Sequence, residues 1–462
     1  ASAELCPSSG EYERFTAAIL NAAIAPVVGR YTARLAGGIG PGTLRLLRQN
    51  LGILPPPEAQ RFPARALFSG PAGGVLATAQ TLAAAGLPQG AAFDMGGTSA
   101  DVCLVSDGAA VHDDGGIAGL PLPLPTVPVH TVGCGGGSIA YVDRGGALRV
   151  GPESAGADPG PACYGRSDVP TVTDAHVALG HLGTGTLLGG GFPIDVDAAV
   201  QSVERLGARI GLSAAQAARG ILAIADATMA RAVLAITAER AVDPAHVPLV
   251  AYGGAGGLHA AGLVQQAGMP FALVPPLPGA FSALGLALAG EAVEAAAACR
   301  VQLDGRSLPR LLRQARELAA AAVAQLGGRG RIQVTAHVRY AGQGAALRLR
   351  CGPRLAAAFA REHARRYGFA LPQAIEVVRL TARAETPARR LPALAAASAA
   401  RTPRAGSRRP PVGGKAIPVV ARADLCRALR GPLVVEEPTA TTLVPRGWTV
   451  APVGGTLRLA RS

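Results

Sequence analysis

Residues 91–105 read AAFDMGGTSADVCLV, and this stretch indicates the fold more strongly than any other part of the chain. An apolar run ends at Asp94, turns on two glycines and two hydroxyl residues, meets Asp101, and leaves on a second apolar run. This pattern predicts a β-hairpin with a glycine-rich tip. Because glycine lets the backbone approach a ligand closely and point its N–H groups at oxyanions, the tip suits a phosphate group.

The residues of this tip define the first part of a predicted nucleotide site. We expect Gly96, Gly97, Thr98, Ser99 and Asp101 to contact phosphate, and Asp94 to hold Mg²⁺ through water. The alternative is a plain hairpin with a Gly-Gly turn whose acids are only solvated.

A second glycine motif lies at residues 247–260, which read VPLVAYGGAGGLHA. A strand would enter glycines at the start of a helix, and the helix N-terminus would leave a slot for a nucleotide. We expect adenosine to be bound by Gly253, Gly254, Gly256 and Gly257. The segment does not match the GxGxxG motif of dinucleotide-binding proteins, since His259 stands at the position of the third glycine. The strand-like run that follows also has no acid to bind a ribose. A P-loop fails too, because Lys415 is the only lysine and lies in an expected linker.

Two glycine motifs of these types, about 150 residues apart, are similar to those of actin-like ATPases and sugar kinases. The 462 residues are 49% hydrophobic and only 4% aromatic, so we expect a large aliphatic core in more than one domain. The formal charge of +14 is spread along the chain as arginine without aromatic interleaving, so we expect no nucleic-acid partner. Seven cysteines without a CxxC pair indicate a reducing compartment. With no leader or membrane span recognised, we expect a cytoplasmic protein without a membrane partner.

The pattern along the chain predicts an α/β fold of several parts. We expect a helical segment at 1–48, an actin-like ATPase core at 49–300, an α+β unit at 301–390, a linker at 391–415 and a β-rich piece at 416–462. Within them, residues 11–35 and 213–240 have helical periodicity, and residues 331–385 read as strand, helix, strand.

Further motifs carry a family resemblance. They are SGPAGGV at 69–75, DMGGTSAD at 94–101, PVHTVGCGGGSIA at 128–140, GPESAGADPGPACYG at 151–165, TVTDA at 171–175, PPLPGAFSALG at 275–285 and RYAGQ at 339–343. The chain therefore resembles the A-type subunits of the hydantoinase/5-oxoprolinase family. The resemblance implies an actin-like ATPase fold, ATP and Mg²⁺, and a B-type partner subunit. It also implies phosphorylation of an amide or enol oxygen, which activates an otherwise poor reacting group.

The resemblance also points to residues between the two nucleotide motifs. Gly135, Gly136, Gly137 and Ser138 form a glycine loop that we expect to cradle phosphate or substrate. His130 is a candidate to orient substrate or donate to an oxyanion, and the alternative is a histidine that packs under the loop. Asp174 is a candidate second-layer acid, or else a helix N-cap. His130, Ser138 and Asp174 are our candidate catalytic residues. We expect Cys134 to fill space in the core, and Cys163 to be structural or close to a metal.

The chain also departs from the family pattern. Family members begin with a lobe carrying a DxGGTFTD motif, which this sequence does not show, so we expect a truncated protein or one product of a split gene. The favoured function is an ATP-dependent hydrolase subunit that opens hydantoin, 5-oxoproline or a similar lactam with a B-type subunit or a separate N-terminal lobe. The alternatives are a subunit of an acetone- or acetophenone-type carboxylase and a non-catalytic remnant.

Overall fold

A computed structural model gives the fold of most of the chain. It describes residues 2–6, 10–39, 44–54, 56–106, 115–117, 119–183, 186–187, 191–387, 389 and 405–462. The chain forms two compact units, each assembled from separate stretches of sequence. Unit 1 comprises Ala1–Ala72, Val111–Val127 and Leu288–Arg390, and unit 2 comprises Gly73–Ala110, Pro128–Ala287 and Leu391–Ser462. Most of the expected linker, residues 391–404, lies outside the described residues, and the domain boundaries drawn from the sequence stay a prediction.

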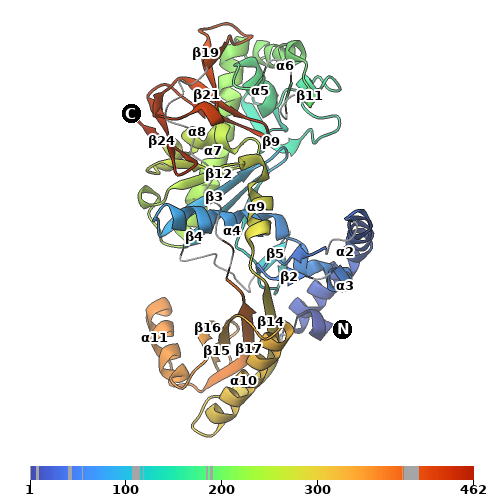
Figure 1. Cartoon of the computed structure of the whole chain (residues 1–462), viewed down its shortest axis with the longest axis vertical. Coiled ribbons are helices and arrows are strands. Elements are labelled where there is room, and N and C mark those ends of the chain that lie inside the picture. The colour runs from blue at the N-terminus through green and yellow to red at the C-terminus, as the bar shows by residue number, and fades with distance from the viewer. Residues whose placement is uncertain are drawn as a thin grey trace. The chain divides into compact units, whose positions relative to one another are not determined.

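Unit 2 is built on a mixed eight-stranded sheet (Figure 1). In spatial order its strands are β20 (Leu429–Arg430), β23 (Trp448–Val453), β24 (Thr456–Arg461), β13 (Ala272–Val274), β12 (Leu249–Tyr252), β3 (Gln89–Met95), β4 (Ala100–Ser106) and β7 (His130–Val132). The central strand β12 runs parallel to both β3 and β13. All four residues of β12 are buried, as expected for an apolar strand covered on both faces.

The predicted glycine-tipped hairpin is confirmed. Strands β3 and β4 pair antiparallel, with Asp94 opposite Asp101. The tip is closed by a hydrogen bond from the Gly96 N–H to the Ser99 carbonyl oxygen, at 3.2 Å. Because β3 is central and its apolar residues are buried, the tip is held at a fixed place beside the end of β12.

Helices α7 (Ala214–Glu239) and α8 (Gly256–Ala267) pack against this sheet, and α5 (Val172–Ala178) and α6 (Val196–Ala208) pack against α7. The long helix predicted at 213–240 is α7, which begins with a capping box between Ser213 and Gln216. Its residues Ile221, Ala225 and Met229 are fully buried at a spacing of one turn, so this face packs into the core. Among the described residues, one helix, α7, is long enough and apolar enough to cross a membrane. The core helix of a soluble protein also meets this criterion.

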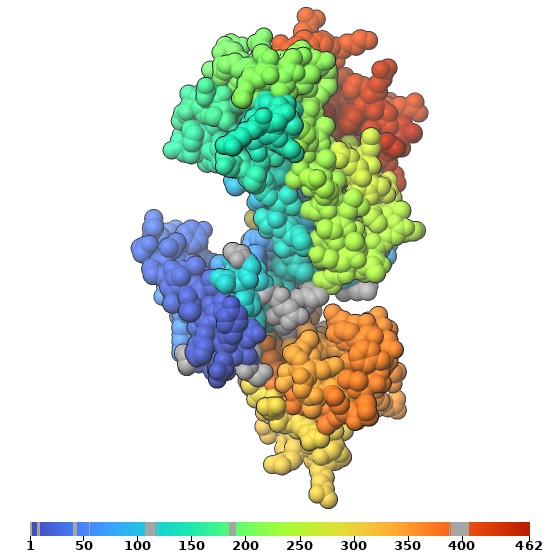
Figure 2. Space-filling model, turned by 180° about the vertical axis from the view of Figure 1, so that it is seen from behind, coloured from blue at the N-terminus to red at the C-terminus, as the bar shows by residue number. Residues whose placement is uncertain are grey.

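A second sheet in unit 2 is formed by the C-terminal residues. Its strands are β18 (Ala405–Arg408), β19 (Ile417–Ala421), β21 (Leu433–Glu437) and β22 (Ala440–Val444), in that order. Helix α8 packs against β22, and Figure 2 shows the red C-terminal residues lying against the green helices. A separate hairpin, β8 (Ser138–Val142) and β9 (Leu148–Ser154), follows the glycine loop at 135–137.

Unit 1 combines the N-terminal helices with an antiparallel sheet. The N-terminal part contains α1 (Ser2–Leu5), α2 (Glu11–Gly38), β1 (Leu46–Leu47), β2 (Ile53–Leu54) and α3 (Pro56–Arg61). The sheet has the order β14 (Ala292–Gln302), β17 (Ile375–Glu385), β15 (Arg331–Tyr340) and β16 (Leu347–Arg350), with helices α10 (Ser307–Gln325) and α11 (Leu355–Tyr367). The strand, helix, strand pattern predicted for residues 331–385 is confirmed by β15, α11 and β17.

Candidate nucleotide site

A cavity of about 1060 Å³ in unit 2 is lined by all three predicted glycine segments. Gly96 and Gly97 belong to the hairpin tip, Gly136 to the loop before β8, and Gly254 to the turn before α8. The segments are far apart in the sequence: the pairing of β12 with β3 brings the turn before α8 to the hairpin tip, and backbone hydrogen bonds join the loop before β8 to that tip. The structure therefore brings the three glycine segments together at one hollow.

The loop at 135–137 supports the hairpin tip from behind. The Gly136 N–H donates to the Gly96 carbonyl oxygen at 3.0 Å, and the Gly137 N–H donates to the Gly97 carbonyl oxygen at 2.6 Å. A Cβ atom on Gly135 would lie 2.6 Å from the carbonyl carbon of Thr98, so only glycine fits there. Because these N–H groups are already used, the expected phosphate cradle at 135–137 is better described as a brace for the tip.

The turn after β12 positions the N-terminus of α8 next to the same tip. Gly253 has φ +81°, and a Cβ there would come within 2.4 Å of the Met95 carbonyl oxygen. That oxygen instead accepts a hydrogen bond from the Ala255 N–H at 3.2 Å. The first turn of α8 thus reaches the cavity with its positive dipole end, a favourable position for an anion.

Two carboxyl groups lie side by side at the base of the hairpin tip. Burial raises the pKa of Asp94 to about 6, an effect that the Ser282 hydroxyl opposes by donating to Oδ2 at 3.2 Å and that Asp101 increases by its charge. Burial also raises the pKa of Asp101, which accepts a hydrogen bond from the Thr131 hydroxyl at 2.6 Å. A bound cation would lower both pKa values, so this pair has the right chemistry to hold a hydrated Mg²⁺.

Two predicted catalytic residues lie outside the cavity lining. Ser138 is fully buried, and its Oγ accepts a hydrogen bond from the Gly135 N–H at 2.8 Å, so it stabilises the loop. His130 lies on β7 with 48% of its side chain exposed, and its Nε2 is 3.4 Å from Glu239 Oε1. The alternative of a histidine packed under the loop is therefore wrong, because the ring faces solvent. A catalytic role for either residue stays a prediction.

Asp174 is buried in a network of backbone donors. It is the third residue of α5, and the N-cap is Thr171, so Asp174 itself is not the N-cap. Its Oδ1 accepts from the Cys163 N–H at 2.8 Å, and its Oδ2 accepts from the Ala162 and Thr171 N–H groups at 3.1 and 2.9 Å. The Thr171 hydroxyl also donates to Oδ2, at 2.7 Å. This carboxylate thus joins the turn at 162–164 to α5.

The two cysteines discussed above are buried. Cys134 belongs to the main core of unit 2, as expected, and burial raises the pKa of its thiol to about 11. Burial also raises the pKa of Cys163, and the nearby Asp174 charge adds to that shift. Among the described residues, no group of three or more His, Cys, Asp and Glu side chains could hold a metal ion.

A row of hydrogen-bonded histidines beside the cavity was not predicted from the sequence. His176 and His259 line the cavity, and their Nε2 atoms are 3.1 Å apart. His176 Nδ1 is 3.0 Å from His181 Nδ1, and His259 Nδ1 is 2.5 Å from Asp226 Oδ1. Burial holds the pKa of His176 well below its usual value and lowers that of His181 to about 4. The lowered pKa values favour neutral rings at His176 and His181, and a neutral ring can donate one N–H to the next histidine in the direction of Asp226.

Part of the cavity lining is aromatic and apolar. Tyr164 and Phe192 both line it, with ring centroids 4.7 Å apart in an edge-to-face arrangement. Leu182 and Leu258 complete this apolar section. Two acidic residues at the end of β21 form ion pairs: Glu437 pairs with Arg422 at 2.8 Å, and Glu436 pairs with Arg408. The cavity thus offers an apolar section and a glycine-rich section.

Comparison with known proteins identifies the family. The model of the family described as hydantoinase/oxoprolinase matches residues 14–294. Caprolactamase subunit alpha of Pseudomonas jessenii is 31% identical over 485 residues, covering 97% of this chain and 69% of that subunit. The crystal structure of ATP-dependent caprolactamase from the same organism superposes with a TM-score of 0.81 at 30% identity, covering 100% of this chain and 72% of that one.

A nucleotide-free structure of acetone carboxylase, from work on ATP-dependent acetone carboxylation, shows the same fold. Its TM-score is 0.84 at 23% identity, and it covers 100% of this chain and 71% of that one. The mixed α/β fold of the actin-like ATPase type expected from the sequence is thereby confirmed. The family's members include ATP-dependent lactam and oxoproline hydrolases as well as ketone carboxylases. The chain belongs to the hydantoinase/oxoprolinase family.

Proposed function

We propose that this chain is the ATP-binding subunit of an enzyme that phosphorylates the carbonyl oxygen of a cyclic amide and so prepares the ring for opening. The observation that carries the proposal is the convergence of three glycine segments and the N-terminus of α8 on one cavity of about 1060 Å³. Hydantoin, 5-oxoproline and related lactams are the proposed substrate class. The similarity to caprolactamase over 97% of the chain supports this class.

The two sections of the cavity suggest how ATP would lie. Its phosphates would meet Gly96, Gly97 and the N-terminus of α8, where backbone N–H groups and the helix dipole favour negative charge. Its adenine ring would lie beside Tyr164 and Phe192, since aromatic rings stack or pack edge-to-face with a purine. This proposal differs from the sequence prediction, which placed adenosine at Gly253, Gly254, Gly256 and Gly257, because Gly256 and Gly257 are buried in α8. Asp94, with Asp101 beside it, would hold Mg²⁺ through water, and the ion would supply charge neutralisation for the transferring phosphoryl group.

The proposed reaction follows from the chemistry of amides. The lactam oxygen attacks the γ-phosphorus, the bond from that phosphorus to the bridging β–γ oxygen breaks, and ADP leaves with the electron pair. Loss of the amide proton leaves a C=N bond with phosphate as a leaving group on carbon. Water then adds to that carbon, and the ring nitrogen takes up a proton and leaves, which breaks the C–N bond and opens the ring to an acyl phosphate. A second water attacks the acyl carbon and releases phosphate, which leaves the amino acid. Such activation is needed because an amide oxygen is a poor leaving group without phosphate.

Ring opening is preferred over ketone carboxylation for this chain. The caprolactamase subunit is similar in sequence over nearly the whole chain, whereas the acetone carboxylase structure, at 23% identity, supports the fold alone. A B-type partner subunit is proposed because the relatives are named as subunits. A cytoplasmic location is proposed from the seven cysteines, which lack CxxC spacing.

The proposal is tested first by binding of Mg·ATP, measured by isothermal titration calorimetry. A side chain at Gly97 would project into open space, because no heavy atom lies within 4 Å of its Cβ position, so Gly97→Leu would fold and fill the phosphate section. We expect micromolar binding to the unmodified chain and a loss of at least about 30-fold in Gly97→Leu. Gly352→Leu, an equally open glycine in unit 1, is the matched control and should bind normally.

Asp94→Asn distinguishes the contribution of Mg²⁺ to binding from that of the nucleotide. We expect it to weaken Mg·ATP more than metal-free ATP, because only the complex uses the carboxylate. Normal Mg·ATP binding by Gly97→Leu would show that the nucleotide lies elsewhere. Release of ADP and phosphate with a lactam panel, in the presence of a B-type subunit, then tests the substrate class.

A further inference from the structure

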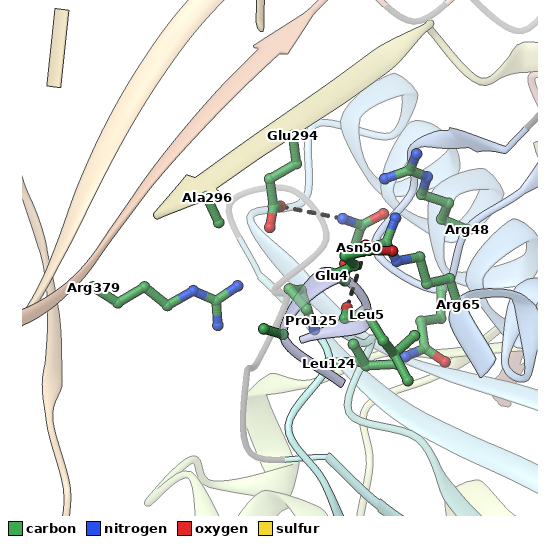
Figure 3. A pocket seen from close by; sticks show the side chains of 12 residues that line it. Glu4, Leu5, Arg48, Asn50, Arg65, Leu124, Pro125, Glu294, Ala296 and Arg379 are labelled. Atoms are coloured by element: carbon green, nitrogen blue, oxygen red, sulfur yellow. Dashed lines mark hydrogen bonds between the residues drawn. The ribbon is translucent and has the colours of Figure 1, made fainter. Parts of the chain in front are cut away.

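Unit 1 contains a smaller cavity, of about 290 Å³, to which the proposed function assigns no role (Figure 3). One side is formed by strands β14 and β17, which contribute Glu294, Ala296 and Arg379. The other side is formed by residues 48–50, Arg65 and the N-terminal residues 3–5. A space of this volume holds a molecule of about ten non-hydrogen atoms, because one water occupies about 30 Å³ in the liquid.

Arg379 faces this cavity, and no ion pair to its side chain exists among the described residues. Its residue surface is only 8% exposed, and Figure 3 shows its guanidinium group pointing from β17 into the hollow. Its Nε is buried without a hydrogen-bond partner, and within the described part of the chain no ion pair reaches its other nitrogens. By contrast, Arg48 and Arg65 both pair with Glu58. A buried charge without a partner is strongly unfavourable, so Arg379 is suited to an anionic ligand.

Glu294 offers the opposite charge in the same cavity. Its Oε2 accepts a hydrogen bond from the neutral Asn50 amide at 3.2 Å, and among the described residues no salt bridge joins its carboxylate to a cation, although its charge also acts on the Arg65 guanidinium. Gln49, which is 1% exposed, also lines the cavity, and neither its Oε1 nor its Nε2 has a partner there. In the part of the chain that the structure describes, the cavity therefore combines one arginine without an ion pair, one carboxylate without a salt bridge, and an unpaired amide.

The strand register sets the spacing between the two charges. Arg379 on β17 lies opposite Ala298 on β14, four residues along the strand from Glu294, so both residues are on the same face of the sheet. Four residues of strand span about 13 Å, and the two long side chains cover part of that distance from either end. The charges do not meet, since no ion pair joins them, which leaves room for a ligand of several carbons between them.

We infer that this cavity binds a small ω-amino acid, whose carboxylate pairs with Arg379 and whose ammonium group pairs with Glu294. An α-amino acid fits less well, because a single carbon separates its two charged groups. A dicarboxylate would bring a second negative charge against Glu294. Hydrolysis of a lactam yields an amino acid of the inferred kind, so the site would hold the product; this last link rests on the proposed function, whereas the binding does not.

The test is calorimetric titration of the full chain, without ATP, with four probes of equal chain length. They are 5-aminopentanoate, pentanoate, pentylamine and glutarate. We expect 5-aminopentanoate to bind at least about tenfold more tightly than pentanoate, with pentylamine and glutarate weaker still, because each of these lacks or reverses one of the two charge pairs. Equal binding of 5-aminopentanoate and pentanoate, or no heat with 5-aminopentanoate at millimolar concentration, would overturn the inference.

Three variants assign the binding to this cavity. Arg379→Gln should reduce 5-aminopentanoate affinity at least tenfold, and Glu294→Gln should remove the advantage of 5-aminopentanoate over pentanoate. Arg331→Gln changes an exposed arginine on β15 of the same sheet and should leave the affinity unchanged. Unchanged affinity in Arg379→Gln would refute the assignment, and Glu294→Gln decides the question if Arg379→Gln does not fold. Titration of Mg·ATP into the same variants tests unit 2 separately, so failure here is distinct from failure of the proposed function.

Discussion

Replacing Asp174 by alanine should destabilise unit 2 severely. The substitution removes the acceptor for the N–H groups of Ala162, Cys163 and Thr171, all three of which are buried. A buried donor left without a partner costs about 1–3 kcal/mol, so three of them cost roughly 3–9 kcal/mol, a large part of the 5–15 kcal/mol that stabilises a typical domain. Asp174→Asn keeps one oxygen and should lose only about 1–3 kcal/mol, because its new NH₂ group faces a single donor.

Urea unfolding followed by tryptophan fluorescence measures this loss in unit 2 itself. Trp448 is the only tryptophan of the chain, and it packs in the same core cluster as Val172 and Ala175 of α5. Asp168→Ala, which changes an exposed carboxylate 3.7 Å from Arg205, is the control and should cost less than about 1 kcal/mol. The reasoning is wrong if Asp174→Ala unfolds at the same urea concentration as the control. A fall in ATP turnover with unchanged stability would instead support the catalytic role predicted from the sequence.

Two further predictions concern unit 2. Gly253→Ala should lower the free energy of unfolding by about 2–5 kcal/mol, since it places a side chain at φ +81° against the Met95 carbonyl oxygen. Gly96→Ala is the control, because its Cβ position is open, and urea unfolding should show little change in its stability. The free energy of unfolding should also fall as the pH drops from about 6.5 toward 4. In this range His181 binds a proton in the unfolded chain but stays neutral in the folded protein, where its pKa is lowered to about 4. His181→Asn should reduce that fall by roughly 3 kcal/mol, and an unchanged pH profile would contradict a neutral histidine chain.

The glycine segments were predictable because their signals are local. The apolar runs on either side of Gly96 and Gly97 specify a hairpin, and the strand before Gly253 specifies a turn into a helix. Which of these glycines can bind phosphate was harder to predict from the sequence. Whether a glycine N–H is free for phosphate depends on what lies behind it, and the Gly136 N–H is occupied by the Gly96 carbonyl oxygen, 40 residues earlier in the chain.

Charged and titratable groups that are far apart in the sequence but adjacent in the structure cannot be recognised from a local sequence pattern. His176 and His259 are 83 residues apart, and the sequence around each reads as ordinary amphipathic helix. Arg379 looks like one more arginine in a basic chain, and only its burial in β17 and the lack of a partner distinguish it.

The physical difference is that a turn is fixed by backbone conformation within a few residues, whereas a binding site is defined by the energy of desolvated groups from several elements. A basic composition therefore hides a functional arginine until the structure shows which guanidinium groups are paired. In unit 1 Arg48 and Arg65 share Glu58, whereas Arg379 has no ion-pair partner in the part of the chain that the structure describes, so its burial calls for an external anion.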